Sequence, residues 1–282
     1  MPALYVVATP IGNLEDVTLR AIRVLKEVKL IAAEDTRKTK RLLDHYGIRT
    51  PMTSYYEHNK MDKLGYLLHF LGTDDLALVS EAGMPGISDP GYELIVAAAE
   101  QGTRVVPVPG PSAIVAAVAV SGLPTDQFTY LGFLPRKKSE RLRLLREVAG
   151  ERRTLVAFEA PHRLTDALRD MLEVLGDRRV AIAREVTKLH EEVFRGTVRE
   201  AIEHFQEPRG EFTIVIDGSK EEATVTLTAE MENEIHVLQQ QGVPARDGVA
   251  RLSAGTGLSR RELYQKWLEI KNSGSMKEGS EA

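Results

Sequence analysis

The sequence predicts two α/β domains, a parallel sheet followed by a mixed sheet, with a small helical module at the C-terminal end. Over residues 1–120, short β-rich runs alternate with helically spaced stretches, which is typical of parallel strands joined by crossover helices. After the turn at 121–124, further β-rich runs follow in a different pattern. The 282 residues are also close to two domains on a length prior of about 150 residues each. We therefore expect domains at 1–120 and 121–218, then a linker, a helical module and a disordered end within 219–282.

The strands of the first domain are expected in short runs rich in valine, leucine, isoleucine and alanine. They are predicted at 4–8, 29–33, 76–80 and 104–108. The stretches between them have the spacing of amphipathic helices. Because each strand is followed by a helix and a parallel strand, the loops after the strands are expected at one edge of the sheet.

The second domain is expected to contain five further strands. They are predicted at 128–133, 154–158, 179–184, 191–195 and 212–217. The last two are interpreted as later strands of a mixed sheet. Helices are predicted to begin near His162 and near Val198.

The segment beyond Gly218 is polar and precedes two or three short helical patterns that end near Lys271. Gly257 is expected to end one helix, Ser259 to cap the next, and Glu262 to complete a capping box. A helix-turn-helix and a packed helix pair acting as a dimerisation or lid element remain equally open. The end of the chain, 272–282, is expected to be disordered.

Composition excludes several classes of site. The chain has no cysteine, which rules out disulfides, thiolate zinc sites and cysteine nucleophiles, and its seven scattered histidines do not suggest a bound metal. No run approaches the roughly 18 apolar residues of a membrane span, so a cytoplasmic protein that does not enter the membrane is expected.

Charge is unevenly distributed along the chain. The formal net charge of −4 argues against a uniformly basic, nucleic-acid-binding surface. The segment 136–153 nevertheless carries eight basic residues against three acidic ones. A polyanion-binding site and a solvated helix face with i,i+4 ion pairs both explain this segment.

Three loops at expected strand ends have the composition of a ligand site. The first, 9–13, contains Pro10, which has no backbone N–H for a pyrophosphate, so a dinucleotide site is disfavoured. The second, 80–91, is rich in glycine and proline, and the third, 107–113, ends with the small Ser112 and Ala113 at a helix start. Because all three are expected at one edge of the sheet, they favour a single pocket.

These loops belong to a series of motifs that resembles the tetrapyrrole methylase superfamily, and within it the branch that methylates small-subunit ribosomal RNA. The motifs lie in order within residues 4–218: VATPIGN, AAEDTRKTKRLL, SEAGMPGISDPGYEL, VPGPSA, GFLPRK, FEAPHR and REVTKLHEE. The resemblance implies a homodimeric enzyme that binds S-adenosyl-L-methionine in the cleft between its α/β domains. It implies methylation of the ribose 2'-hydroxyl of a cytidine in the decoding region of 16S rRNA, with the small ribosomal subunit as partner. The chemistry of the transfer itself needs no metal.

The resemblance also implies which residues bind the cofactor. They lie in the three loops and on two strands of the second domain: Pro10, Ile11, Gly12, Gly83, Met84, Pro85, Ile87, Ser112, Ala113, Phe158 and Thr213. Two positions depart from the branch, with Met84 in place of the usual threonine and Glu81 in place of the usual aspartate. Since the contact at position 84 is expected through the backbone, the first change concerns packing, whereas the second alters the reach of a carboxylate.

Methyl transfer from a sulfonium is an in-line displacement that needs alignment and a base for the hydroxyl proton. The candidates for catalysis are Glu81, His58, Glu57 and Asp35. Asp35 is equally suited to cap a helix, and for Asp89, a further carboxylate of the second loop, helix capping is preferred.

RNA contacts are expected from two basic groups and from aromatic residues. The basic residues are Arg37, Lys38, Lys40, Arg41, Arg136, Lys137 and Lys138. Tyr55 and Tyr56 are candidates for stacking on an unpaired base, with core packing preferred for at least one of them.

Two alternatives remain open. A corrin, porphyrin-precursor or diphthamide-pathway methylase would share the fold, but basic segments on both domains favour RNA. A non-catalytic ribosome-assembly factor would keep the RNA-binding surface, but three intact ligand loops favour an enzyme.

Overall fold

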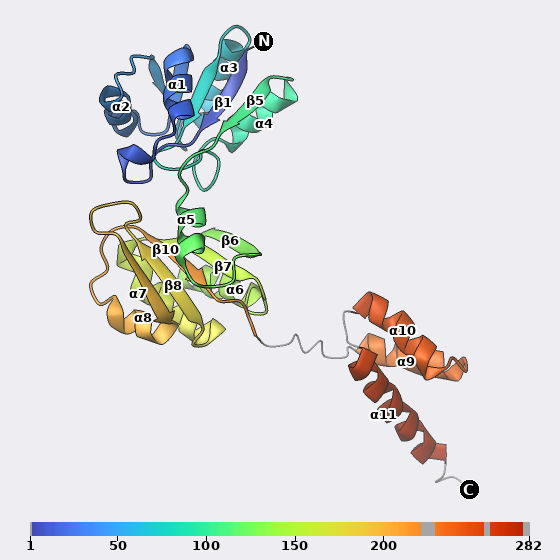
Figure 1. Cartoon of the computed structure of the whole chain (residues 1–282). Helices are drawn as coiled ribbons and strands as arrows, with labels where there is room; N and C mark the ends of the chain where they lie inside the picture. The colour runs from blue at the N-terminus through green and yellow to red at the C-terminus, as the bar shows by residue number, and fades with distance from the viewer. Residues whose placement is uncertain (1, 221–228, 257–259, 279–282) are drawn as a thin grey trace. The chain divides into compact units, whose positions relative to one another are not determined.

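The computed structural model describes residues 2–220, 229–256 and 260–278. The chain divides into two compact units, Met1–Lys220 and Glu221–Ala282. The first unit contains two five-stranded sheets, and we call each sheet with its packed helices a lobe (Figure 1).

The sheet of the first lobe is entirely parallel, as predicted. Its strands are β1 (Ala3–Val7), β2 (Leu30–Ala33), β3 (Met52–Ser54), β4 (Leu76–Val79) and β5 (Arg104–Val108), in the order β3-β2-β4-β1-β5. The four predicted strands are confirmed. The short edge strand β3 was not predicted, because its residues Met-Thr-Ser are only partly buried and form no apolar run.

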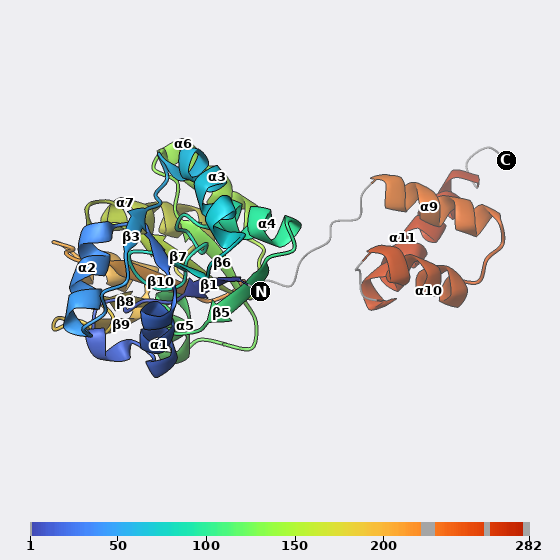
Figure 2. The same cartoon turned by 90° about the horizontal axis from the view of Figure 1, so that it is seen from above.

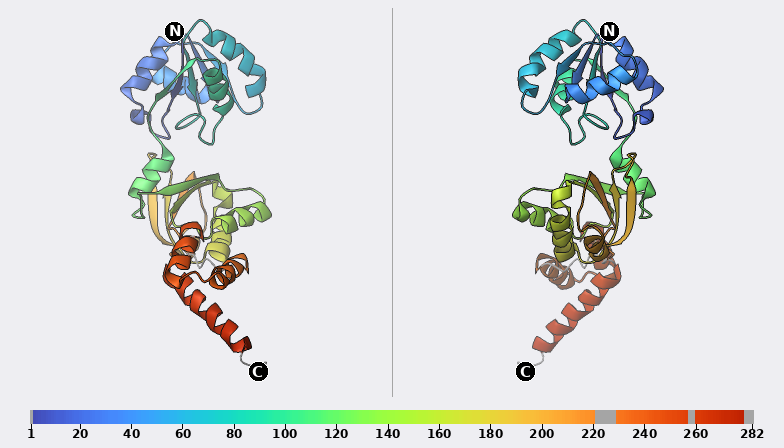
Figure 3. Two further views of the ribbon diagram at one scale, coloured as in Figure 1. Left: turned by 90° about the vertical axis from the view of Figure 1, so that its right-hand side faces the viewer. Right: turned by 90° about the vertical axis from the view of Figure 1, so that its left-hand side faces the viewer.

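Helices cover both faces of this sheet. On one face α1 (Leu19–Glu27) and α2 (Thr36–His45) bury Val24, Leu25 and Leu43 against the strands. On the other face α3 (Lys60–Leu71) and α4 (Tyr92–Glu100) pack beside each other (Figure 2). Figure 3 shows the blue helices on one side of the sheet and the teal helix on the other. With both faces covered, the carboxyl edge of the strands is where a ligand can approach.

The sheet of the second lobe is mixed, which confirms the predicted fold class. Its strands are β6 (Phe128–Phe133), β7 (Thr154–Glu159), β8 (Arg179–Arg184), β9 (Glu192–Thr197) and β10 (Phe212–Ile216). The order is β6-β7-β10-β8-β9, with β6 and β7 parallel and the other pairs antiparallel.

One face of this sheet packs against three helices and the other against one. The helices α6 (Lys138–Glu147), α7 (Pro161–Leu175) and α8 (Val198–His204) share a core with it, and α7 and α8 begin where the sequence predicts. On the opposite face α5 (Ala113–Val120) packs through Ala117 and Val118 against Val156 and Val215. The expected boundary at residue 120 assigns α5 to the first domain, whereas its apolar side is buried on the second sheet.

The second unit is helical in its described residues. It consists of α9 (Ala229–Gln240), α10 (Ala245–Thr256) and α11 (Arg260–Glu278), which bury Ile235, Leu252 and Trp267 together. The structure describes α11 as far as Glu278, so residues 272–278 of the end that was expected to be disordered are helical. The predicted helix end at Gly257, the cap at Ser259 and the side chain of Glu262 lie outside the described residues.

Among the described residues, no helix is both long enough and apolar enough to cross a membrane.

Candidate active site

The three loops predicted to form one pocket meet at Gly83. Thr9, just after β1, and Gly83, after β4, exchange two backbone hydrogen bonds of 2.9 and 3.0 Å. A Cβ atom on Gly83 would lie 3.6 Å from Ile11 Cγ2 and 3.8 Å from the carbonyl oxygen of Pro111, which belongs to the loop after β5. The φ angle of Gly83 is 76°, a left-handed conformation that favours glycine. The structure therefore brings these loops together at a residue whose left-handed backbone favours glycine.

The second lobe faces this junction with an aromatic cluster. Phe158 on β7 lies in register with Thr213 on β10, and its ring packs 5.4 Å from the Tyr130 ring and 5.3 Å from the Phe133 ring, measured between centroids. The Tyr130 hydroxyl is 2.7 Å from Ser88 Oγ in the glycine-rich loop. Phe158 and Thr213 are therefore linked to the first lobe through Tyr130.

The remaining expected cofactor residues differ in exposure. Pro85 is buried, Met84 packs on the core of the first lobe, and 49% of Ile87 is exposed. Ser112 caps α5 by accepting from the Val115 N–H at 3.5 Å, and Ala113 is the first residue of that helix. Because α5 follows β5 of the first lobe and packs on the second sheet, both residues lie where the chain crosses between the lobes.

Carboxylates gather at the ends of β2 and β4. Glu81 forms an ion pair with Lys38, and its backbone N–H donates to Glu34 Oε2 at 3.0 Å. Burial, opposed by Lys38 and reinforced by Asp35, raises the pKa of Glu34. Glu34 was not singled out from the sequence, although its position directly after a buried strand is the signal that would have found it.

Asp89 does not cap α4, so the preferred interpretation of this residue is wrong. The N-cap of α4 is Gly91 and it makes no side-chain capping bond, because the strained turn before the helix places glycine at φ 147°. Burial, together with the charge of Glu34, raises the pKa of Asp89 to about 6 despite a hydrogen bond from Ser80. Asp89 is thus a carboxylate whose proton affinity is close to that of a neutral-pH base.

Asp35, in contrast, is occupied as the N-cap of α2. It accepts hydrogen bonds from the backbone N–H groups of Arg37 and Lys38 at 2.8 and 3.2 Å, and these bonds lower its pKa. The capping role that the sequence left open for Asp35 is therefore realised in the structure.

The segment after β3 presents a second polar group. Glu57 pairs with Lys60 at 2.9 Å, and Lys60 also pairs with Glu93 at 2.5 Å. Hydrogen bonds from Lys60 to Glu93 and Glu57 raise the pKa of Lys60 to about 12. His58 is exposed beside Tyr56, with ring centroids 6.3 Å apart.

The two tyrosines of this segment have different environments. Tyr55 is fully buried in the core of the first lobe, whereas 41% of Tyr56 is exposed. Core packing for one of the pair is therefore confirmed, and Tyr56 is the tyrosine of the two whose ring is exposed.

The basic segment 136–153 contains one arginine that is not at the surface. Arg141 is 5% exposed and binds Asp170 through Nε at 2.7 Å and through a terminal nitrogen at 2.6 Å, and it donates to the Pro135 carbonyl at 3.2 Å. Arg163, which is partly buried, pairs with the buried Glu159 at 3.0 Å and donates to the Leu134 carbonyl. The basic charge that this segment offers to a partner is therefore smaller than its composition indicates.

The exposed cations of this segment directly follow Leu134 and Pro135, whose carbonyls accept hydrogen bonds from Arg163 and Arg141. Lys137 pairs with Glu140 at 3.2 Å, Lys138 pairs with Asp170 at 3.4 Å, and Arg136 is exposed. On α2, Arg37, Lys40 and Arg41 are exposed beside Lys38. The predicted RNA-binding residues thus form two separate basic groups, one on each lobe.

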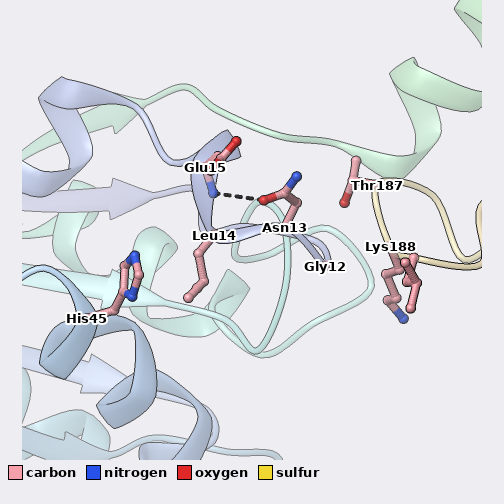
Figure 4. Close-up of a pocket in the computed structure, with 8 residues that line it drawn as sticks. Gly12, Asn13, Leu14, Glu15, His45, Thr187 and Lys188 are labelled. Atoms are coloured by element: carbon pink, nitrogen blue, oxygen red, sulfur yellow. Dashed lines mark hydrogen bonds between the residues drawn. The ribbon is translucent and has the colours of Figure 1, made fainter.

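A hollow of about 690 Å³ opens between the lobes next to Ile11 (Figure 4). It is lined by residues 12–15, by His45 of α2 and by residues 187–189 of the connection between β8 and β9. No cluster of three or more histidine and acidic side chains suited to a metal occurs in the described parts of the chain.

Comparison with known proteins gives one family and one recurring name. The family model described as Tetrapyrrole (Corrin/Porphyrin) Methylases matches residues 3–202. A protein of Synechocystis sp. named Ribosomal RNA small subunit methyltransferase I is 46% identical, over 97% of this chain and 100% of its own length. Proteins of the same name from Thermotoga maritima and Bacillus subtilis are 52% and 42% identical, over 78% and 95% of this chain and 100% and 94% of their own lengths.

Solved structures share the fold at low identity. The methyltransferase CobJ is 19% identical with a TM-score of 0.60, covering 78% of this chain and 95% of its own. Diphthine synthase is 12% identical with a TM-score of 0.57, covering 76% and 90%. At such identities the similarity concerns the fold alone.

Proposed function

Because the chain belongs to the tetrapyrrole methylase family, we propose that it transfers a methyl group from S-adenosyl-L-methionine to small-subunit ribosomal RNA. The acceptor is the ribose 2'-hydroxyl of a cytidine in the decoding region of 16S rRNA. The protein acts as a homodimer in the cytoplasm, on the RNA within the small ribosomal subunit.

The observation that carries this proposal is the meeting of three ligand loops at Gly83. Their backbone groups lie at the carboxyl edge of a parallel sheet, where small ligands bind in folds of this kind. The residues present fit the cofactor, because exposed loop backbone suits its adenosine and the carboxylates at this edge complement a positively charged sulfonium. We propose that the loop residues, with Phe158 and Thr213 on the second lobe, hold it.

The bound cofactor supplies an electrophilic methyl group attached to a sulfonium. The protein has to hold the 2'-oxygen in line with that methyl group and remove the hydroxyl proton as the new oxygen–carbon bond forms. Asp89 is suited to accept this proton, because its raised pKa leaves it ionised yet basic at neutral pH. Glu81 and His58, both exposed, are proposed to orient the substrate near it.

The choice of RNA over a small molecule rests on the relatives and on charge. The relatives of 42–52% identity are named for ribosomal RNA, whereas the structures of a uroporphyrin-III-C-methyltransferase, of the methyltransferase CobJ and of diphthine synthase match at only 12–19%. Exposed basic residues on α2 and at 136–138 give both lobes a surface suited to phosphates.

The proposal is tested with small subunits from a strain that lacks the enzyme. Labelled S-adenosyl-L-methionine and the purified protein should transfer the label to one cytidine ribose of 16S rRNA, mapped by fragmentation of the RNA. Subunits from the parent strain, already methylated, serve as the control and should accept little label. Cofactor binding in calorimetry with no label transferred to either RNA would contradict the proposed substrate.

A further inference from the structure

The hollow beside Ile11 is built from both lobes. Figure 4 shows the segment of the 3-10 helix η1 (Leu14–Asp16) facing the connection that carries Thr187 and Lys188. It borders the proposed cofactor loop directly, because Gly12 belongs to both. A ligand in the hollow would therefore lie next to the loop proposed to hold the cofactor.

Thr187 stands out among the lining residues for its backbone and for its hydroxyl. Its φ angle is 68°, a left-handed conformation that is a genuine outlier for a β-branched residue. Its hydroxyl oxygen is buried without a hydrogen-bond partner, closed off by Gly12, where an added Cβ would lie 3.0 Å from it. Backbone strain and an unpaired buried hydroxyl are both unfavourable in the free protein, and they are typical of a site that a ligand completes.

The walls of the hollow combine apolar and polar groups. Leu189 is 93% exposed and Leu14 is 36% exposed, and these two side chains give the hollow its apolar part. Asn13 accepts from the Glu15 N–H at 3.0 Å through its oxygen, which leaves its amide NH₂ to donate. The carboxylate of Glu15 disfavours a phosphate here and favours a group with N–H donors.

A basic stripe leads to the hollow along α2. Arg37, Arg41 and His45 follow one another at intervals of four residues, which places them on one face of the helix, and all three are exposed. Arg37 contacts Asp35 at 3.5 Å, and no ion-pair partner for Arg41 occurs among the described residues. His45, at the end of the stripe, lines the hollow.

We propose that the hollow holds an unpaired base of the substrate RNA, whose phosphates follow the stripe on α2. This inference rests on the proposed function and assigns a binding site to its substrate. The apolar side chains of Leu14 and Leu189 contact the faces of the base, and Glu15 and Asn13 meet its polar edge. Rotation of the Thr187 side chain away from Gly12 brings its hydroxyl to the base, which gives that hydroxyl the partner it lacks in the free protein.

The test is a pair of substitutions at position 187. Thr187→Val keeps the shape and the backbone preference but removes the hydroxyl, and Thr187→Ser keeps the hydroxyl. We expect Thr187→Val to raise KM for undermethylated small subunits about tenfold, the effect of one lost hydrogen bond to a bound ligand. Cofactor affinity in calorimetry should stay at the parent value, and Thr187→Ser should restore KM.

Thermal stability separates this role from a purely structural one. Because the hydroxyl is unpaired in the free protein, Thr187→Val should leave the Tm unchanged or raise it, whereas loss of a structural hydrogen bond would lower it. A parent-like KM in Thr187→Val would overturn the inference while leaving the proposed function intact. Failure of the unmodified protein to methylate subunits would instead overturn the proposed function.

A second variant tests the apolar wall without depending on position 187. Leu189→Ser should raise KM for subunits at least threefold, because a base would lose its apolar contact, with no change in Tm. Leu19→Ser is the matched control, since Leu19 is 86% exposed and does not line the hollow. Dissociation of a dimer by Leu189→Ser in analytical ultracentrifugation would assign Leu189 to a subunit interface and overturn its role in RNA binding.

Discussion

Replacing Asp89 by asparagine should stabilise the protein at neutral pH and slow methyl transfer. The pKa of Asp89 is raised from 3.8 to about 6, so the folded state binds this proton more tightly than the unfolded state. The contribution of Asp89 to stability is therefore complete below its unfolded pKa and is lost as the pH rises to about 6. Asparagine does not ionise and avoids this loss.

The size of the effect follows from the pKa shift. A shift of about two units corresponds to at most about 3 kcal/mol, at 1.36 kcal/mol per unit. Because Asp89 is only partly buried, solvent screening reduces the expected gain to about 1–2 kcal/mol. The gain should be present at about pH 8 and small at about pH 4, where Asp89 is protonated in the folded state and already partly protonated in the unfolded state.

Urea unfolding at several pH values measures this difference, and single-turnover methylation measures the chemical step. If Asp89 is the base, turnover of the parent should rise as the pH passes about 6, and Asp89→Asn should lose about 10²–10⁴-fold at pH 8. A stability gain that is the same at pH 4 and pH 8 would refute the raised pKa. Undiminished turnover in the variant would refute the role as a base even if the stability effect is found.

Three further outcomes are expected. Gly83→Val should abolish cofactor binding in calorimetry, because it forces a β-branched residue into φ 76° at the meeting of three loops. Gly102→Val is the control, because Gly102 has nearly the same φ, 75°, but lies in open space. This control should cost only about 1–2 kcal/mol of stability and leave cofactor binding intact. Glu81→Gln and His58→Ala should keep cofactor affinity and lower turnover, and an equal loss of affinity would show instead that these side chains hold the cofactor. Replacing the exposed Arg136, Lys137 and Lys138 by alanine should flatten the slope of log RNA affinity against log salt concentration by about 2–3. An unchanged slope would show that these three side chains do not contact phosphates.

The strands and the sheet types could be predicted because burial imposes its pattern on the sequence. Runs such as 30–33 and 76–79 are buried throughout, and a strand covered on both faces has to be apolar. The edge strand at 52–54 is free of that demand, so its sequence carries no comparable signal.

The meeting of three loops could also be predicted, because it follows from the topology of parallel strands. The roles of single charged residues could not. Asp89 and Asp35 both precede a helix, yet only Asp35 caps one, since the turn around Gly91 directs the backbone differently. Arg141 has the same charge as its exposed neighbours, and only the position of Asp170 on another helix decides that it points inward.

The packing of α5 on the second sheet determines how this protein can be divided into fragments. A fragment that begins at residue 121 would lack the helix that covers Val156, Ala181 and Val215. Those side chains would then form an exposed hydrophobic patch prone to aggregation. A fragment that ends at residue 120 would carry α5 without the sheet that buries it. Expression of either lobe alone should therefore place the cut ahead of α5, in the loop at 109–112, so that the helix travels with the strands it covers.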